Sequence, residues 1–125
     1  MKTVQSKGAN RRKTGKLYEQ AAAGYLRRLG YEILEENFHC RYGEIDLIVK
    51  ESTTVVFVEI KYRSGRAKGL PEESVDVLKQ SKISLAATFY LSRHAALLDT
   101  SCRFDVIAIE GKELRHYKNA FPYRM

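Results

Sequence analysis

Two neighbouring apolar segments, residues 43–50 and 53–62, constrain the fold more than any other part of the chain. Both are rich in Val and Ile, which favours β-strands, and only a short polar turn separates them. Side chains two residues apart in a strand point to the same face. Each strand is therefore expected to carry two charges on one face: Glu44 and Asp46 on the first, Glu59 and Lys61 on the second. The apolar residues between these charges are expected to face a core together: Ile45 with Leu47, and Val58 with Ile60.

The turn between these strands also predicts their register. A tight turn centred on residues 52–53 places Asp46 directly across from Glu59, and Glu44 across from Lys61. Directly opposed side chains have Cβ atoms ~5 Å apart, and two like charges so placed destabilise the sheet. Two facing carboxylates therefore need a cation between them, or a shared proton that raises the pKa of at least one. Mg²⁺ suits this position because it takes one or two carboxylates together with phosphate oxygens.

The alternative interpretation is a solvated charged face on an edge hairpin. Any one of these acids, taken singly, is more often structural than functional. The combination is more specific than its parts: two acids at alternate positions, a Glu-Ile-Lys triplet on the next strand, and a register that makes them face each other. This combination favours a site that handles phosphates.

The whole chain predicts an α/β fold with a mixed sheet, in the order α-β-β-β-α-β-β. The helices are expected at residues 16–29, ended by Gly30, and at about 72–92, with Pro71 in the first turn. The other strands are expected at residues 31–38, 103–109 and 113–118. The predicted organisation is a flexible basic arm (residues 1–14), a single domain (residues 15–120) and a C-terminal tail (residues 121–125).

Charged residues interrupt the apolar faces of both predicted helices. The apolar half of the first helix consists of Leu17, Tyr18, Ala21, Ala22, Tyr25, Leu26 and Leu29. Glu19 lies at the border of that half, where it is either solvated or directed toward the acidic strands. The apolar arc of the second helix consists of Val75, Leu78, Ile83, Leu85, Ala86, Phe89 and Tyr90. Lys79 and Lys82 project into the middle of this arc. They either reach the acidic site or a phosphate there, or extend along apolar surface to water.

The net charge of +7 lies entirely at the N-terminus. Residues 1–28 contain eight Lys and Arg and one acid, whereas the rest of the chain has 14 of each sign. Such a segment indicates either polyanion binding or a solvated tail. No apolar run reaches the ~18 residues of a membrane span, and the start lacks the apolar core of a signal peptide, so we expect a cytoplasmic protein. Two cysteines without metal-site spacing indicate reduced thiols, and the three isolated histidines indicate surface or packing roles.

The motifs GEIDLIV, FVEIKYR, a basic glycine-containing loop (RSGRAKGL), a helix with LKQSKI and a late RFDVI strand occur in this order over about residues 15–109. This ordered set resembles the YraN-like bacterial family. That family is predicted to be nuclease-like and belongs to the PD-(D/E)XK superfamily, with archaeal Holliday junction resolvases and restriction endonucleases as relatives. The resemblance implies a restriction-endonuclease-like fold, with a mixed central sheet flanked by helices, and DNA as the substrate.

The resemblance also implies roles for individual residues. The metal-binding Asp of the superfamily falls on Asp46, its (D/E)XK triplet on Glu59, Ile60 and Lys61, and the helical Glu of resolvases on Glu19. Asp46, Glu59 and the carbonyl of Ile60 are expected to hold Mg²⁺ or Mn²⁺. One departure from the motif is Ile45, which stands where a Pro would precede the Asp. The expected phosphate contacts are Arg11, Arg12, Lys13, Arg63, Arg66, Lys68, Lys79 and Lys82. For Arg63 the alternative is an exposed residue at the end of its strand without such a contact.

These features together predict a metal-dependent endonuclease-like protein that hydrolyses phosphodiester bonds in DNA, branched or junction DNA included. The alternative is a non-catalytic nucleic-acid-binding module that retains the nuclease fold. Resolvase relatives are homodimers, so a homodimer is a further expectation by analogy. An RNA-directed role has no aromatic cluster of the RRM type to support it.

Deleting residues 1–13 tests the basic arm. The deletion removes five of the eight early positive charges: Lys2, Lys7, Arg11, Arg12 and Lys13. If these groups contact duplex phosphates, DNA affinity should fall. The slope of log K against log salt should become shallower by roughly 0.9 for each phosphate that the arm no longer neutralises. Fluorescence anisotropy titrations at several salt concentrations measure both effects, and an unchanged slope would identify the arm as a solvated tail.

Overall fold

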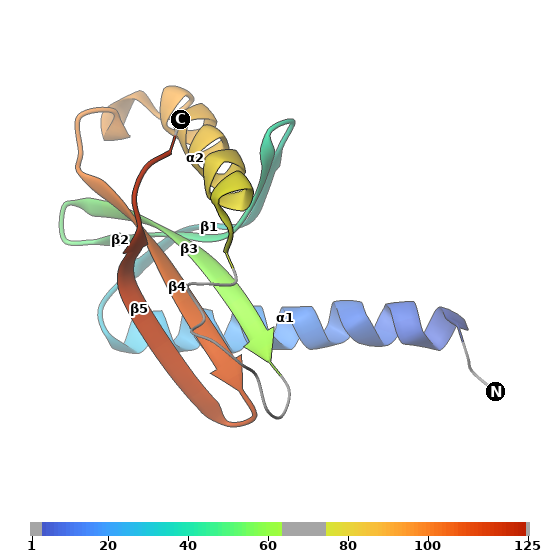
Figure 1. The fold of residues 1–125 in the computed structure, drawn as a ribbon. Helices are drawn as coiled ribbons and strands as arrows, with labels where there is room; N and C mark the ends of the chain where they lie inside the picture. The colour runs from blue at the N-terminus through green and yellow to red at the C-terminus, as the bar shows by residue number, and fades with distance from the viewer. Residues whose placement is uncertain (1–3, 64–74, 125) are drawn as a thin grey trace.

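The computed structural model describes residues 4–63 and 75–124, and its elements follow the predicted order. The elements are α1 Val4–Arg28, β1 Glu32–Cys40, β2 Gly43–Glu51, β3 Thr54–Arg63, α2 Val77–Ser92, the 3₁₀ turn η2 Ala95–Leu97, β4 Cys102–Glu110 and β5 Glu113–Phe121. The five strands form one sheet in the order β1-β2-β3-β4-β5 (Figure 1). Only β3 and β4 are parallel, so the predicted α/β fold with a mixed sheet is confirmed. None of the described helices is long and apolar enough to cross a membrane.

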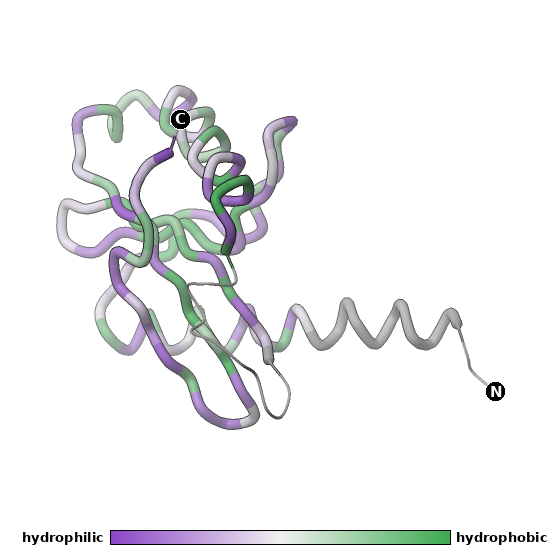
Figure 2. Tube along the Cα trace, viewed as in Figure 1, coloured by the Kyte–Doolittle hydropathy of each residue, from purple (hydrophilic) through white to green (hydrophobic). Residues whose placement is uncertain are grey.

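The sheet lies between its two helices. Because β3 and β4 are parallel, the chain must return from one end of the sheet to the other between them, and α2 lies on this crossover. Figure 1 shows α2 above the sheet and α1 running across it on the other side. Hydrophobic residues are concentrated in the central strands and in α2, whereas the turns and β5 are more hydrophilic (Figure 2).

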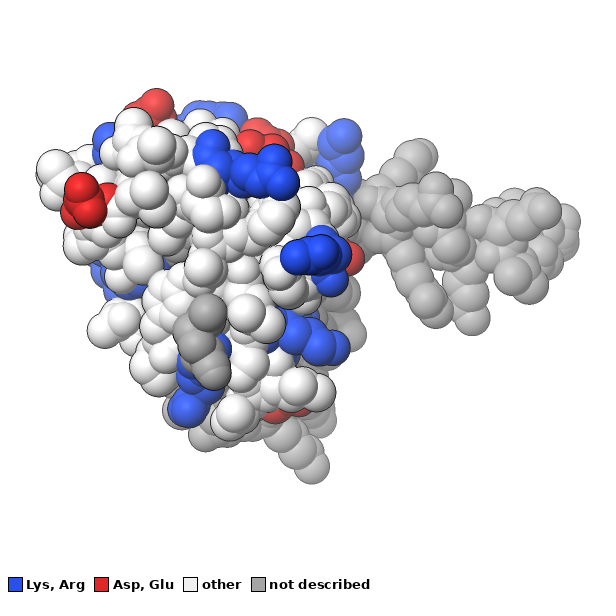
Figure 3. Space-filling model, turned by 90° about the horizontal axis from the view of Figure 1, so that it is seen from above, with Lys and Arg blue, Asp and Glu red and all other residues white. Residues whose placement is uncertain are grey.

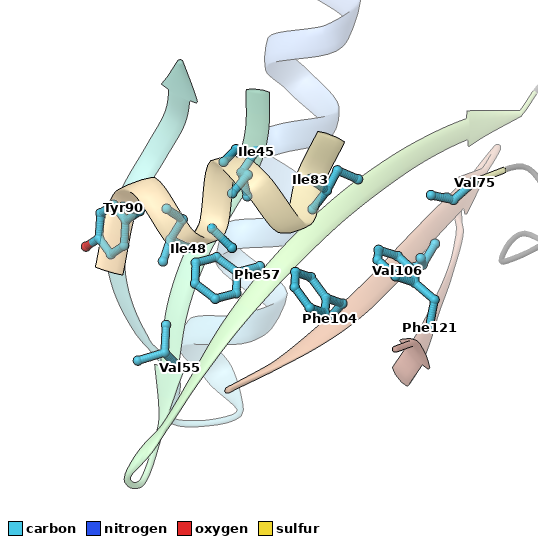
Figure 4. Packing of buried hydrophobic residues seen from close by; sticks show 12 residues of the cluster. Ile45, Ile48, Val55, Phe57, Val75, Ile83, Tyr90, Phe104, Val106 and Phe121 are labelled. Carbon is cyan, nitrogen blue, oxygen red and sulfur yellow. The ribbon is translucent and has the colours of Figure 1, made fainter. Parts of the chain in front are cut away.

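Side-chain alternation along the central strands fills both layers. On β3, Val55 and Phe57 point toward α2, while Val56 and Val58 point toward α1. The α2 layer also contains Phe104, stacked on Phe57 with ring centroids 5.5 Å apart (Figure 4). Two buried faces explain why β3 reads as a nearly continuous apolar run. The α1 layer is completed by Ala22, Ala23, Leu26, Tyr31, Leu47, Val49, Ile107 and Ile109.

Both helices bury a face that overlaps only in part with the predicted one. On α1, Leu17 and Leu29 are exposed and Ala23 is buried instead. α1 therefore contacts the sheet through Ala22 and Ala23 together with the fully buried Leu26. On α2, Leu78 and Leu85 are exposed, and the buried set is Gln80, Ile83, Ser84, Ala86, Ala87 and Tyr90. The polar members of this set bond to the chain's last residues: the backbone N–H of Arg124 donates to Ser84, and its guanidinium to Gln80.

The helix ends follow local capping chemistry. α1 ends as predicted, because Gly30 adopts a φ of 95° and the N–H groups of Gly30 and Tyr31 bond back to the carbonyls of Arg27 and Leu26. α1 begins at Val4, well before the predicted residue 16. α2 begins at Val77, later than the predicted residue 72. Its N-cap is Asp76, whose carboxylate accepts the Lys79 N–H at 2.8 Å.

A buried ion network ties α1 to the edge of the sheet. Asp105 on β4 is fully buried and accepts hydrogen bonds from Arg103, from His116 at 2.7 Å and from the Asn119 N–H at 2.9 Å. The other ring nitrogen of His116 lies 3.0 Å from the Tyr25 hydroxyl on α1. Burial alone would raise the pKa of Asp105, but these hydrogen bonds hold it below its ordinary value. His116 was predicted to be a surface or packing residue, but it also links Asp105 to Tyr25 through this network.

Asp105→Asn should destabilise the fold by about 3–5 kcal/mol, because the buried His116 loses its carboxylate partner and Arg103 keeps only Glu51 among its two acidic partners. Urea unfolding at neutral pH measures the change. Glu113→Gln is the matched control, since that carboxylate is exposed and pairs with Arg115, an interaction worth less than about 1 kcal/mol. The Asp105 pKa is depressed, so its contribution is present above about pH 3.9 and is lost as the pH falls further. A loss under 1 kcal/mol for Asp105→Asn would contradict this role.

Candidate active site

The predicted register of the β2–β3 hairpin is confirmed as far as Leu47 and Val58, but the pairing stops there, so the predicted pairs Asp46–Glu59 and Glu44–Lys61 are not formed. Backbone pairing runs from Glu51 opposite Thr54 to Leu47 opposite Val58. Beyond this pair the two strands diverge, as Figure 4 shows. We call the space between them the acidic fork, lined by Asp46 from β2 and by Glu59 and Lys61 from β3. β2 and β3 stop pairing where their charged residues begin, and the fork forms at this point.

The strand alternation changes at Asp46, contrary to prediction. Ile45 packs in the α2 layer and Leu47 in the α1 layer, although residues two apart were expected on one face. The change coincides with Asn37 on β1, which lies between the pairs Glu36–Leu47 and Phe38–Ile45 and has a φ of 53°. Asn tolerates this left-handed conformation better than most residues. The local twist therefore turns Asp46 out of the regular ladder and into the fork.

Asp46 takes over a backbone hydrogen bond at the fork. Its carboxylate accepts the Ile60 N–H at 2.7 Å, so a side chain replaces the missing strand partner. Burial and the nearby negative charge of Glu59 raise the pKa of Asp46 to about 7, despite the opposing effect of that hydrogen bond. Two crowded carboxylates are expected to raise the pKa of at least one of them, and the direction at Asp46 agrees with that expectation.

Glu59 is the most enclosed acid of the fork, and two lysines neutralise it. Its side chain is only 9% exposed, with one oxygen 2.7 Å from the Lys79 ammonium and 3.6 Å from that of Lys61. Burial lowers the pKa of Lys61, and the neighbouring Lys79 lowers it further against the attraction of Glu59. For Lys79, burial acts in the same direction, but its bond to Glu59 leaves its pKa above the ordinary value. Lys61 is thus the ammonium that gives up its proton more readily.

Glu19 approaches the fork from α1. Its carboxylate accepts a hydrogen bond from the Asn37 side chain at 2.7 Å, and its charge contributes to the raised pKa of Asp46. Of the two alternatives for Glu19, a solvated side chain or one directed toward the acidic strands, these interactions favour the second. Sequence reasoning does not single out Asn37, although an Asn inside a strand is unusual and is itself a signal of irregular backbone.

A pocket of about 410 Å³ opens on the α2 side of the fork. Its acidic wall contains Asp46 and Glu59, and its basic wall contains Lys79 and Lys82 from α2. Glu44 also lines the pocket, at an exposed position. Basic side chains are scattered over the face seen from above α2, with a few acidic ones among them (Figure 3).

The predicted phosphate contacts divide into two groups. Lys79 and Lys82 lie at the pocket as expected. Arg66 and Lys68 lie outside the described residues, as do the side chains of Arg11, Arg12, Lys13 and Arg63. Among the described residues, no cluster of three or more His, Cys, Asp or Glu side chains is arranged to hold a metal ion.

The sequence has close relatives in several bacteria. Residues 18–109 match the uncharacterised protein family UPF0102, a span that includes Glu19, the acidic fork and α2. The chain is 44% identical over 112 residues to a UPF0102 protein of Lachnoclostridium phytofermentans, covering 90% of this chain and 95% of that protein. It is 46% identical over 114 residues to a UPF0102 protein of Syntrophus aciditrophicus, covering 87% and 88%. It is 44% identical over 108 residues to UPF0102 protein GSU0650 of Geobacter sulfurreducens, covering 82% and 84%.

Asp46→Asn should melt at the same temperature as the unchanged protein or higher when both are measured in EDTA. The amide can still accept the Ile60 N–H, while the repulsion from Glu59 is removed. Because the folded pKa of Asp46 is raised, its ionisation costs stability as the pH rises from about 3.9 to about 7, and the variant avoids this loss. Thermal melts across that pH range measure the effect.

Glu44→Gln, two residues away and exposed, is the control and should melt like the unchanged protein. In excess Mg²⁺ the order of Asp46→Asn and the unchanged protein should reverse, since ligand binding stabilises the protein that binds more tightly. An Asp46→Asn variant that is clearly less stable in EDTA would identify Asp46 as a structural ion-pair partner instead.

Proposed function

The chain belongs to the uncharacterised protein family UPF0102, the YraN-like family that its motifs indicate, and we propose that it is a divalent-metal-dependent phosphodiesterase acting on DNA. The observation that carries the proposal is the acidic fork, where two carboxylates crowd together beside two lysines. Such crowding costs stability, so a fold that keeps it without a use for it is unexpected. The proposed relation to the PD-(D/E)XK nucleases rests on the same residues.

The donor chemistry of the fork fits a hard divalent cation. Asp46 and Glu59 supply carboxylate oxygens, and the raised pKa of Asp46 reflects negative charge that a cation would balance. Mg²⁺ is commonly held by one or two carboxylates plus substrate phosphates, so two are sufficient. Asp46, Glu59 and the carbonyl of Ile60 would hold the ion, with Glu19 nearby. When bound, Mg²⁺ or Mn²⁺ supplies Lewis acidity and lowers the pKa of an attacking water.

Lys61 is the residue proposed to act on the reacting atoms. It lies beside Glu59 and is partly buried, with its side chain 21% exposed, which places an ammonium at the edge of the fork. A fixed positive charge there stabilises the extra negative charge that develops on a phosphate during attack. The lowered pKa of Lys61 also suits a group that orients a water and exchanges a proton with it.

Lys79 and Lys82 are proposed to hold the substrate strand. Lys79 sits in the first turn of α2, fixed by the Asp76 cap, and its 45%-exposed side chain can leave Glu59 for a phosphate. Lys82 lies one turn later on the same pocket. Contacts of this kind favour binding without selecting a base sequence.

One observation favours the alternative of a non-catalytic nucleic-acid-binding module. Both lysines neutralise Glu59, and the described part of the chain gathers no third acidic or histidine ligand for a metal. In that case the fork would bind a phosphate through Lys61 and Lys79, with Glu59 only holding them in place. The two functions differ in what happens to the DNA after binding.

The deciding experiment is a cleavage panel of duplex, nicked, flapped, single-stranded and four-way DNA. With Mg²⁺ or Mn²⁺ at least one substrate should be cut, and EDTA should abolish cutting. Lys61→Ala should lose at least about 100-fold in turnover, as expected for a positioned charge or proton-transfer group, while DNA affinity is retained. Lys50→Ala is the control and should cut normally, because Lys50 pairs with Val55 at the opposite end of β3 from Lys61. Undiminished cutting by Lys61→Ala would overturn the assignment, and binding without cutting of any substrate would favour the binding module.

A further inference from the structure

Two tyrosines stack on each other beside the acidic fork. Tyr18 from α1 and Tyr62 from β3 have ring centroids 4.2 Å apart and planes inclined by 20°. Tyr18 is partly buried and packs against the α1 layer of the core. Tyr62 remains 48% exposed. The pair is therefore an inner ring fixed by the core and an outer ring that faces solvent.

The position of this pair follows from the residues next to it in the chain. Tyr18 immediately precedes Glu19, which influences the pKa of Asp46, and Tyr62 immediately follows Lys61, which pairs with Glu59. Consecutive Cα atoms are about 3.8 Å apart, so Tyr62 directly follows the fork residue Lys61 on β3, with its side chain on the opposite face of the sheet. Alternation along β3 places Tyr62 on the α1 side of the sheet, opposite the pocket that α2 covers.

We propose that Tyr62, supported by Tyr18, is a platform on which one unpaired nucleobase of the substrate stacks. This inference rests on the proposed function, because the fork then holds a phosphate of the same strand. One face of the Tyr62 ring lies on Tyr18, which fixes the orientation of the ring. Its other face is left for a ligand to stack on. Every nucleobase has a π-face, and stacking on such a ring is tolerant of sequence.

The platform specifies a class of DNA. In a continuous duplex both faces of each base are covered by its neighbours, so a base can stack on Tyr62 only where the duplex is interrupted. Flaps, overhangs, bulges and junctions provide such bases, and intact duplex does not. Lys16, two residues before Tyr18 on α1, is exposed, and a positive charge there suits the backbone of a strand that leaves the duplex.

A role in anchoring α1 does not account for the exposure of Tyr62. An anchoring aromatic ring gains most of its stabilisation by burial, as Tyr25 and Tyr31 do on the same side of the sheet. The anchoring role nevertheless predicts a distinct result. If Tyr62 only packs against Tyr18, any apolar side chain of similar size should replace it.

The test compares Tyr62→Phe with Tyr62→Leu, because only Phe keeps a ring face. Affinity is measured in EDTA by fluorescence anisotropy, so cleavage plays no part, for a duplex with a short single-stranded flap and for the same duplex without it. Tyr62→Phe should bind the flapped DNA like the unchanged protein. Tyr62→Leu should bind it roughly five- to 150-fold more weakly, the effect of removing one base stack. Both variants should bind the intact duplex alike, and thermal melts should show both folded.

A 2-aminopurine placed in the flap gives an independent readout, since stacking quenches its fluorescence. Quenching should occur with the unchanged protein and with Tyr62→Phe, and should disappear with Tyr62→Leu. Equal flap affinity and equal quenching for the two variants would overturn the platform. If flapped DNA is then still cut with Mg²⁺, the proposed nuclease function stands without the platform. Quenching without cutting of any DNA would contradict the proposed nuclease function and leave the platform supported.

Discussion

The acidic fork depends on how the negative charge of Glu59 is balanced, because the fold buries this carboxylate between β3 and α2. A carboxylate that is only 9% exposed is stable there because two ammonium groups reach it. One of them, Lys79, comes from α2, so the fork is complete only when the crossover helix is packed on the sheet. The Asp76 cap fixes the first turn of that helix, and Val75 just before it is buried in the core. The charge balance of the fork therefore depends on the packing of α2 against the sheet.

The other side of the fork depends on α1, which is held by different chemistry. Small side chains let α1 lie close to the sheet, and Tyr25 connects it through His116 to the fully buried Asp105. This network is distant in sequence from the fork, yet it fixes the helix that carries Glu19. Loss of a hydrogen bond at Asp105 would thus affect the acid near Asp46 through the position of α1. Two buried carboxylates thus position the elements that meet at the fork. Glu59 is neutralised by lysines, and Asp105 by Arg103 and hydrogen bonds.

The sequence predicts the strands and the hairpin register well, because these follow from a period of two and a short turn. Leu47 lies opposite Val58 as the Ser52–Thr53 turn requires. The helix faces are predicted less well, since Leu17 and Leu78 are exposed while Ser84 is buried. A helical wheel takes only hydrophobicity into account. In the structure, the buried side chains must also fit against the sheet, and in α2 two of them form hydrogen bonds with Arg124. The change of face between Ile45 and Leu47 also escapes a periodic rule, because it depends on the left-handed Asn37 of a neighbouring strand.

Charge balance gives a physical reason to treat metal and phosphate as joint ligands under the proposed function. Glu19, Asp46 and Glu59 against Lys61 and Lys79 leave one formal negative charge at the fork when all five are ionised. A divalent cation alone would reverse that charge, and a phosphodiester alone would double it. Bound together, they bring the fork to neutrality, which a partly buried site favours because uncompensated charge is costly there. Each ligand should then bind more tightly in the presence of the other, and by linkage the two effects are equal in size. Lys79 is the group through which this coupling would act, since its bond to Glu59 is the contact that a cation weakens and a phosphate replaces.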